Sequence, residues 1–232
     1  MNLVESKEAG RGLLAGLLPN VVACAETRED RLGIELFRSE RMSLGRAVEK
    51  RRRDFITGRA CARLALERLG VPVVAISSGE HGEPLWPAGV VGSITHCAGY
   101  RACAAARAGV ITSLGIDAEP NVPLPEGVLE QVAFGRERER VAQRSPVQHS
   151  ADQIDLPRLL FSAKEAVYKA WFPLAHRWLG FDDVDLSIDL SGARFRAELL
   201  VPGPFVDGGR LTEFAGRWAV EDGIIVTAIV VR

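Results

Sequence analysis

The chain has 232 residues, of which 47% are hydrophobic, and it carries a formal net charge of −1 at pH 7. This length and composition are typical of a soluble globular protein with a sizeable core, built as one large domain or two small ones. The near-neutral charge excludes a global attraction to nucleic acid or to a membrane surface. Any recognition of anions must therefore come from local clusters of basic side chains.

The cysteines of the chain are Cys24, Cys61, Cys97 and Cys103. Their spacing matches neither a zinc site nor a disulfide-bonded scaffold, so we expect reduced thiols and a cytoplasmic location. The apolar segment near the start is interrupted by Pro19 and Asn20, unlike a secretory signal. No run reaches the ~18 apolar residues that cross a bilayer, so we expect no membrane span.

The first half of the chain predicts one long helix followed by strands. Residues 46–69 place apolar side chains at helical spacing, and a glycine and a proline follow them. On this helix Arg52, Arg59 and Arg63 share roughly one stripe, which by itself indicates only a solvated basic face. Apolar stretches separated by glycines and by a loop at 79–89 predict strands over 73–79, 89–96, 101–109 and 111–119.

The second half repeats this outline. Residues 156–174 predict a second long helix, and a shorter helix is expected over 126–135. The alternating charges of residues 136–140 indicate a solvated helix face. Strands are predicted over 181–190, 193–201 and 216–231, the last folding into a hairpin at Glu221, Asp222 and Gly223.

These elements predict an α+β (α/β) fold with two similar, pseudo-symmetric lobes, residues 1–115 and 116–232. Each lobe is expected to pack an antiparallel sheet against one long helix, with a ligand cleft between the lobes. No flexible linker separates the two halves, so we expect them to pack tightly. Because one polypeptide then builds the whole cleft, we expect a monomer.

A pair of carboxylates closes the strand predicted over 111–119. Asp117 and Glu119 are two residues apart, so a strand presents them on one face, roughly 7 Å apart. Two acids so close repel each other unless a cation lies between them, and Mg²⁺ prefers oxygen ligands. The alternative is that both face solvent at a strand end that Pro120 terminates.

A third carboxylate lies on the helix predicted over 156–174. Its buried stripe runs through Ala163, Ala166, Val167, Ala170 and Trp171, and Pro173 is expected to end the helix. The side chains expected to turn away from this stripe are Lys164, Glu165, Tyr168 and Lys169. The alternative for Glu165 is structural, because Ser162 and Glu165 have the spacing of a capping box.

Three segments carry a resemblance to a known family: "VGSITHCAGY", "LGIDAEP" and "FSAKEAVYKAWFPL". In this order and spacing they resemble the signature segments of the Sfp-type 4′-phosphopantetheinyl transferases, most closely the PptT-like group. The stretches "KRRRDFITGRACAR" and "GEHGEPLWPAG" look like that group's coenzyme A-binding helix and adenine-side loop. The resemblance runs from about residue 46 to the C-terminus, and residues 1–45 and 136–156 carry little of it.

The resemblance implies a metal site and a reaction. Asp117, Glu119 and Glu165 match the residues that hold Mg²⁺, with Mn²⁺ as an alternative, against the pyrophosphate of coenzyme A. A carrier-protein serine would attack the β-phosphorus of coenzyme A and release adenosine 3′,5′-bisphosphate. Asp117, Glu165 and Lys169 are then the expected catalytic residues. Either Glu165 or a water on the metal would take the serine proton.

The resemblance also implies which residues bind coenzyme A. Arg51, Arg59 and His96 match positions that contact its phosphates, especially the 3′-phosphate, and guanidinium groups suit this because they pair with two phosphate oxygens at once. Lys164 and Lys169 match lysines near the pyrophosphate. His81 stands where relatives often carry lysine, so its charge is expected to fade as the pH rises past the imidazole range.

His96 has two further interpretations. The adjacent Cys97 suggests a Cys/His dyad, but neighbours on a strand point to opposite faces. A hydrogen-bonded structural histidine is the other alternative to phosphate binding.

The expected partners are acyl and peptidyl carrier proteins of polyketide, nonribosomal peptide or fatty acid synthesis, with no nucleic acid and no membrane. Carrier helices near the modified serine are commonly acidic, so docking is predicted on the loop after Glu119. The residues expected to take part are Val128, Val132, Phe134, Arg136 and Arg138. Two other functions stay open: a Mg²⁺-dependent pyrophosphatase of coenzyme A or nucleotides, and a non-enzymatic nucleic-acid-binding protein using the stretch "KRRRDF".

Overall fold

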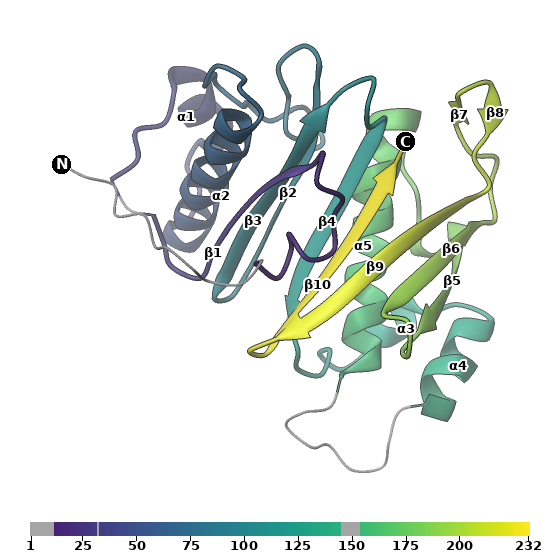
Figure 1. Ribbon diagram of the computed structural model, residues 1–232. Coiled ribbons are helices and arrows are strands. Elements are labelled where there is room, and N and C mark those ends of the chain that lie inside the picture. Colours follow the sequence, from purple (N-terminus) through teal and green to yellow (C-terminus); the bar gives the residue numbers. More distant parts are fainter. Residues whose placement is uncertain (1–11, 32, 145–153) are drawn as a thin grey trace.

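The computed structural model describes residues 12–31, 33–144 and 154–232. Figure 1 shows two sheets side by side, with α2 packed on the first and α5 on the second. In chain order the elements are β1 (Ala23–Thr27), α1 (Arg38–Leu44), α2 (Glu49–Arg68), β2 (Val90–Cys97), β3 (Tyr100–Arg107), β4 (Ser113–Pro120), α3 (Val128–Val132), α4 (Arg136–Arg144), α5 (Leu156–Ala175), the 3₁₀ helix η1 (Phe181–Asp183), β5 (Val184–Asp189), β6 (Arg194–Leu199), β7 (Phe205–Val206), β8 (Gly209–Arg210), β9 (Glu213–Glu221) and β10 (Ile224–Val231).

The first sheet has three antiparallel strands in the order β1-β3-β2. Its central strand β3 is rich in alanine and is buried on both faces. Cys103 and Ala105 pack against α2, whereas Ala102 and Ala104 pack against the segment that precedes β1. These small side chains let the helix and the segment approach the strand closely from opposite sides.

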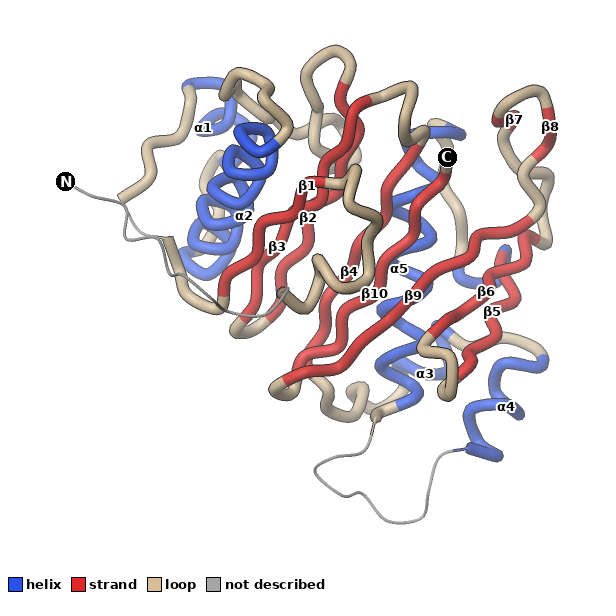
Figure 2. The backbone as a smooth tube through the Cα atoms, viewed as in Figure 1, coloured by secondary structure: helices blue, strands red, loops and turns tan. Residues whose placement is uncertain are grey.

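The second sheet has five antiparallel strands in the order β4-β10-β9-β6-β5. Figure 2 shows α5 running along one face of this sheet. The core between them contains the fully buried Trp171 of α5 together with Ile225 and Ile229 of β10. The predicted long helices and the C-terminal hairpin are confirmed, and so is the α+β class. Within the described residues, no helix is both long enough and apolar enough to span a membrane.

The two sheets meet where β2 lies beside β4, and side-chain hydroxyl groups join them. Ser93 Oγ accepts a hydrogen bond from the backbone N–H of Ile116 at 3.1 Å. Thr95 Oγ1 accepts one from the N–H of Ala118 at 3.0 Å. Both hydroxyl-bearing residues are buried, so these bonds satisfy backbone groups that no neighbouring strand reaches.

β4 crosses the boundary expected at residues 115 and 116. It pairs with β10 from Ser113 to Pro120, so the change from the first sheet to the second lies before Ser113. The division into two similar lobes stays a prediction.

The strand predicted over 73–79 is wrong, because this segment forms only an isolated bridge between Ser78 and Pro84. Arg59 Nε donates to the carbonyl of Ile76 at 2.6 Å, and the Ile76 N–H donates to Glu40 Oε1 at 3.0 Å. Side chains from α1 and α2 thus bond both backbone groups of Ile76. The segment therefore needs no neighbouring strand.

α5 begins at Leu156, as predicted, and ends later than expected. Asp155 caps it by accepting a hydrogen bond from the Arg158 N–H at 2.8 Å. Ser162 therefore lies well inside the helix, where it bonds Thr227 at 3.0 Å, and the alternative of a capping box with Glu165 is wrong. The expected stop at Pro173 is also wrong, because the helix continues to Ala175. A missing N–H so near the C-terminus disturbs only the final turn.

Gly115 determines how closely α5 approaches β4. A Cβ atom at this position would lie 2.0 Å from the carbonyl oxygen of Ala166 and 2.7 Å from the nitrogen of Ala170. We expect Gly115→Ala to lower the free energy of unfolding by about 1–3 kcal/mol, because helix backbone would have to move. Urea denaturation measures this. The control is Gly16→Ala, whose Cβ meets nothing nearer than 3.5 Å, and equal losses in both variants would contradict the expectation.

Candidate active site

Asp117 lies on the face of β4 that α5 covers, and it is 5% exposed. Its Oδ1 accepts hydrogen bonds from Lys169 Nζ at 2.7 Å and from the Thr95 hydroxyl at 3.3 Å. The structure thus joins two of the predicted catalytic residues, which are 52 positions apart in the sequence. Thr95, which the sequence analysis did not single out, holds the same carboxylate from β2.

The second oxygen of Asp117, Oδ2, is buried, and no described residue forms a hydrogen bond with it. Leaving a carboxylate oxygen without a donor is costly inside a protein, and such atoms often mark the place of an ion or ligand. This orphaned oxygen is therefore the strongest local indication of a bound group.

Glu119 is half-buried at the end of β4. Its Oε2 accepts a hydrogen bond from Arg158 Nη1 at 2.9 Å. Burial and the nearby charge of Asp117 raise the pKa of Glu119, and Arg158 opposes this shift. The sequence analysis did not identify Arg158. A signal was present, because Arg158 precedes Glu165 by seven residues, which places both on one stripe of the helix.

Glu165 is half-buried on α5. Burial and the charge of Asp117 raise the pKa of Glu165, whereas Lys169 opposes the shift. Asp117 therefore acts electrostatically on both of the other predicted ligands. Within the part of the chain that the structure describes, no three His, Cys, Asp or Glu side chains form a group that could hold a metal ion as placed.

Two adjoining cavities have volumes of about 530 Å³ each, and Glu165 borders one of them. The first cavity lies between β2, the loop at 81–86 and α5, and Glu165 and Lys169 line it. The second cavity lies between α2 and the loop at 78–82, and Arg51 and Arg59 line it. The residues that line both are His81, Gly82, Pro84, Ile94 and His96. The shared lining joins them into one site large enough for an extended ligand.

The basic residues of the second cavity differ in how firmly they are held. Arg59 is 6% exposed and donates to Ile76 and Ser78. Burial lowers the pKa of Arg59 to about 10, which leaves it charged at neutral pH. Arg51 is exposed at the cavity edge. His96 Nδ1 lies 3.9 Å from Asp54 Oδ2.

His96 and Cys97 do not behave as a catalytic dyad. Burial, followed by the charges of Glu119 and Asp117, raises the pKa of Cys97 to about 12. The thiol therefore stays protonated at neutral pH and is not activated as a nucleophile.

A third and smaller pocket of about 100 Å³ lies on the other side of Glu165. We call it the apolar groove. Its lining consists of Lys164, Glu165, Tyr168, Trp178, Leu179, Gly180, Phe181 and Val184. Glu165 and Tyr168 line both this groove and the first cavity, so the two are neighbours.

The prediction that Lys164 turns away from the apolar core is wrong, since it is 3% exposed. Its Nζ donates to Glu137 Oε2 at 2.7 Å and to the carbonyls of Val132 at 2.9 Å and Phe181 at 2.6 Å. Together with the carbonyl of Val184 at 3.3 Å, these acceptors are enough for all three hydrogens of the ammonium group. Lys164 contributes its stem to the apolar groove, but its charge points into the protein and away from the two larger cavities.

Glu137 contradicts the prediction of a fully solvated face at 136–140, because it is 1% exposed. Besides Lys164, it accepts hydrogen bonds from the N–H groups of Phe134 at 2.9 Å and Leu186 at 2.7 Å. The pair therefore fixes α4 to α5 and β5. Residues 145–153 lie outside the described part of the chain.

Two family profiles match the chain in succession. Residues 39–106 match the 4′-phosphopantetheinyl transferase N-terminal domain, and residues 113–219 match the 4′-phosphopantetheinyl transferase superfamily. The 4′-phosphopantetheinyl transferase Npt of Nocardia iowensis is 49% identical over 225 residues, covering 94% of this chain and 99% of the relative. The chain belongs to the 4′-phosphopantetheinyl transferase family.

Other relatives of the transferase agree with this assignment. The 4′-phosphopantetheinyl transferase Svp of Streptomyces mobaraensis is 49% identical, covering 94% of this chain and 89% of the relative. The 4′-phosphopantetheinyl transferase PptT of Mycobacterium tuberculosis is 45% identical, covering 94% and 97%. The transferase moves 4′-phosphopantetheine from coenzyme A to carrier proteins, as the resemblance of its motifs implies.

The buried pair of Lys164 and Glu137 gives a stability prediction for the transferase. Lys164→Met leaves the Glu137 carboxylate buried without its counter-charge, so we expect a loss of about 3–5 kcal/mol in the free energy of unfolding. Chemical denaturation measures the loss, with the exposed Lys50→Met as the matched control. A Lys164→Met variant as stable as the control would show that the pair does not support the fold.

Proposed function

We propose that the transferase binds the adenosine end of coenzyme A in the second cavity and its pyrophosphate in the first, beside Lys169. The observation that carries this assignment is the position of Lys169, which lines the first cavity while it bonds the buried Asp117. Arg51, Arg59 and His96 line the second cavity and suit the 3′-phosphate. His81 lines both cavities and lies edge-on to Phe172 at a centroid distance of 5.2 Å.

We assign the pantetheine arm to the apolar groove. This groove continues past Glu165 from the first cavity, and Trp178 and Leu179 offer apolar surface to an uncharged chain. Lys164 is left out of the proposed phosphate contacts because Glu137 and backbone carbonyls already bind its ammonium group.

The chemistry of Asp117, Glu119 and Glu165 suits a hard divalent cation, Mg²⁺ or Mn²⁺, although the described side chains do not gather the three carboxylates into a metal-binding group as placed. The donor set consists of oxygens, and Asp117 Oδ2 is buried without a hydrogen-bond partner among the residues that the structure describes. Asp117 also raises the pKa of the two glutamates, so a shared cation would relieve repulsion within the group. When bound, such an ion neutralises charge on the pyrophosphate oxygens and assists attack at phosphorus.

The reaction then places the carrier serine at the junction of the first cavity and the apolar groove. Its hydroxyl oxygen bonds to the β-phosphorus, and the bond to the leaving adenosine 3′,5′-bisphosphate breaks. Glu165 lines both pockets, which places it to accept the serine proton. Lys169 is placed to stabilise negative charge on the departing phosphate.

We propose docking of acidic acyl and peptidyl carrier proteins of polyketide, nonribosomal peptide or fatty acid synthesis on α3 and the start of α4. Arg136 is exposed there, and Val128 and Phe134 are half-buried. Val132 is 1% exposed, so it supports this surface from beneath and offers no contact. Arg138 donates to the carbonyls of Ala133 and Glu130, which holds its charge near the loop between the helices.

The transferase remains a proposed monomer of the cytoplasm. The free thiols of Cys61, Cys97 and Cys103 support a reducing compartment.

Intact-mass measurement of an apo carrier incubated with the transferase, coenzyme A and Mg²⁺ tests the proposed site. We expect the mass of one phosphopantetheine to be gained with the wild type. The gain should fall at least about 100-fold in rate with Asp117→Ala and Glu165→Ala, as expected when a group acting on the transferred phosphate is removed. Coenzyme A cleaved rapidly without a carrier would favour the pyrophosphatase, and wild-type rates in both variants would refute the site.

A charge reversal tests the docking surface. Arg136→Glu should raise the KM for an acidic carrier about tenfold and leave the KM for coenzyme A unchanged, because rim charges act mainly on association. Arg196→Glu, on the exposed face of β6, is the control. A KM for the carrier that is equal in both variants would remove the electrostatic part of the docking proposal.

A further inference from the structure

Arg158, in the first turn of α5, forms hydrogen bonds with a carboxylate and with two backbone carbonyls. Its Nη1 donates to Glu119 at 2.9 Å, its Nε donates to the carbonyl of Val122 at 3.0 Å, and its Nη2 donates to the carbonyl of Pro123 at 2.8 Å. The side chain is only 13% exposed. All three nitrogens of one guanidinium group thus join α5 to Glu119 and to the loop that follows it.

The geometry leaves one oxygen of Glu119 available. Among the described residues, Arg158 bonds this carboxylate through Oε2, which leaves Oε1 for another ligand. The loop is held at a second point, since Asn121 Oδ1 accepts a hydrogen bond from the Asp155 N–H at 2.9 Å. Loop and carboxylate are therefore positioned together by the first turn of α5.

The charges around Glu119 also indicate that Arg158 acts on the protein itself. Asp117, Glu119 and Glu165 supply three carboxylates, and Lys169 and Arg158 supply two cations, each bonded to one of the β4 acids. Lys169 lines the first cavity, where it is available to substrate, but Arg158 lines neither large cavity. Its charge is therefore directed at the protein's own carboxylate.

We infer that Arg158 is a positioning residue: it orients Glu119 for the divalent cation and ties that carboxylate to the loop leading to α3. The inference rests on the proposed cation site. Metal-binding carboxylates are commonly held by such outer hydrogen bonds, whose loss weakens metal affinity about 10–100-fold. The opposite role, in which Arg158 competes with the cation for Glu119, predicts tighter metal binding when the arginine is removed.

Titration with Mn²⁺, followed by the electron paramagnetic resonance signal of the free ion, separates these roles without any turnover. We expect Arg158→Met to bind Mn²⁺ about 10–100-fold more weakly than the wild type. Arg158→Lys keeps the charge but loses the fork of donors, so it should fall between the two. Affinity for adenosine 3′,5′-bisphosphate in metal-free buffer should stay unchanged in both variants, because Arg158 lies outside the cavities.

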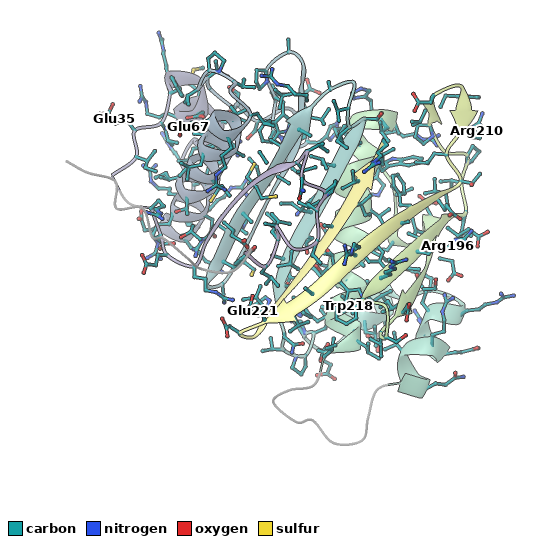
Figure 3. All side chains as sticks on the ribbon, viewed as in Figure 1. Glu35, Glu67, Arg196, Arg210, Trp218 and Glu221 are labelled. Carbon is teal, nitrogen blue, oxygen red and sulfur yellow. The ribbon has the colours of Figure 1, made fainter. Side chains whose placement is uncertain are left out.

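The matched control is Arg196→Met, which removes an arginine that pairs with Glu213 on the second sheet. Arg196 lies on β6, and β9 and β10 separate this strand from β4 (Figure 3). Its Mn²⁺ affinity should equal that of the wild type.

Wild-type or tighter Mn²⁺ binding by Arg158→Met overturns the inference. If Arg158→Met fails to fold by circular dichroism, Arg158→Lys decides, and wild-type affinity in that variant overturns it. These results would leave phosphopantetheine transfer by the wild type intact, so only the role of Arg158 would fail. A wild type that transfers phosphopantetheine but binds no Mn²⁺ would instead reject the proposed cation site, and the inference with it.

Discussion

The contact between Lys169 and Asp117 joins α5 to β4 at the candidate active site, and the close packing of α5 on β4 makes this contact possible. Gly115 has no side chain to keep the helix backbone away from the strand. At that short spacing, Lys169 reaches the buried carboxylate and the charge of Asp117 reaches Glu165. If α5 lay farther from β4, Lys169 and Glu165 would be too far from Asp117 for these interactions.

Lys164 and Glu165 are adjacent on α5, but their surroundings give them different roles. Lys164 is buried with acceptors for all of its ammonium hydrogens, and Glu137 completes its pairing. Its neighbour Glu165 lies between two pockets, and burial makes its charged form less favourable. A satisfied buried ion pair supports the fold, whereas a carboxylate held beside other acids at a cavity is prepared for a cation or a proton.

The N-terminal region shows why part of the site could not be predicted. Glu40 binds the backbone of Ile76 and also pairs with Arg63, and Arg59 binds the same backbone from α2. These contacts replace the strand expected over 73–79, and Arg59 also lines the second cavity. Each is made between residues 17 to 36 positions apart, so no local pattern of hydrophobicity or charge indicates them.

The sequence by itself determined the long helices, the C-terminal hairpin, and the pair of acids that alternation in a strand places on one face, because these depend on local periodicity. It also identified the family through the order of its motifs. Only the tertiary structure decided that Lys164 faces inward, that Thr95 and Arg158 hold the acids, and that two cavities share a lining that includes His96. The physical reason is that the partner of a buried charge depends on which elements pack together, and that packing is a property of the whole chain.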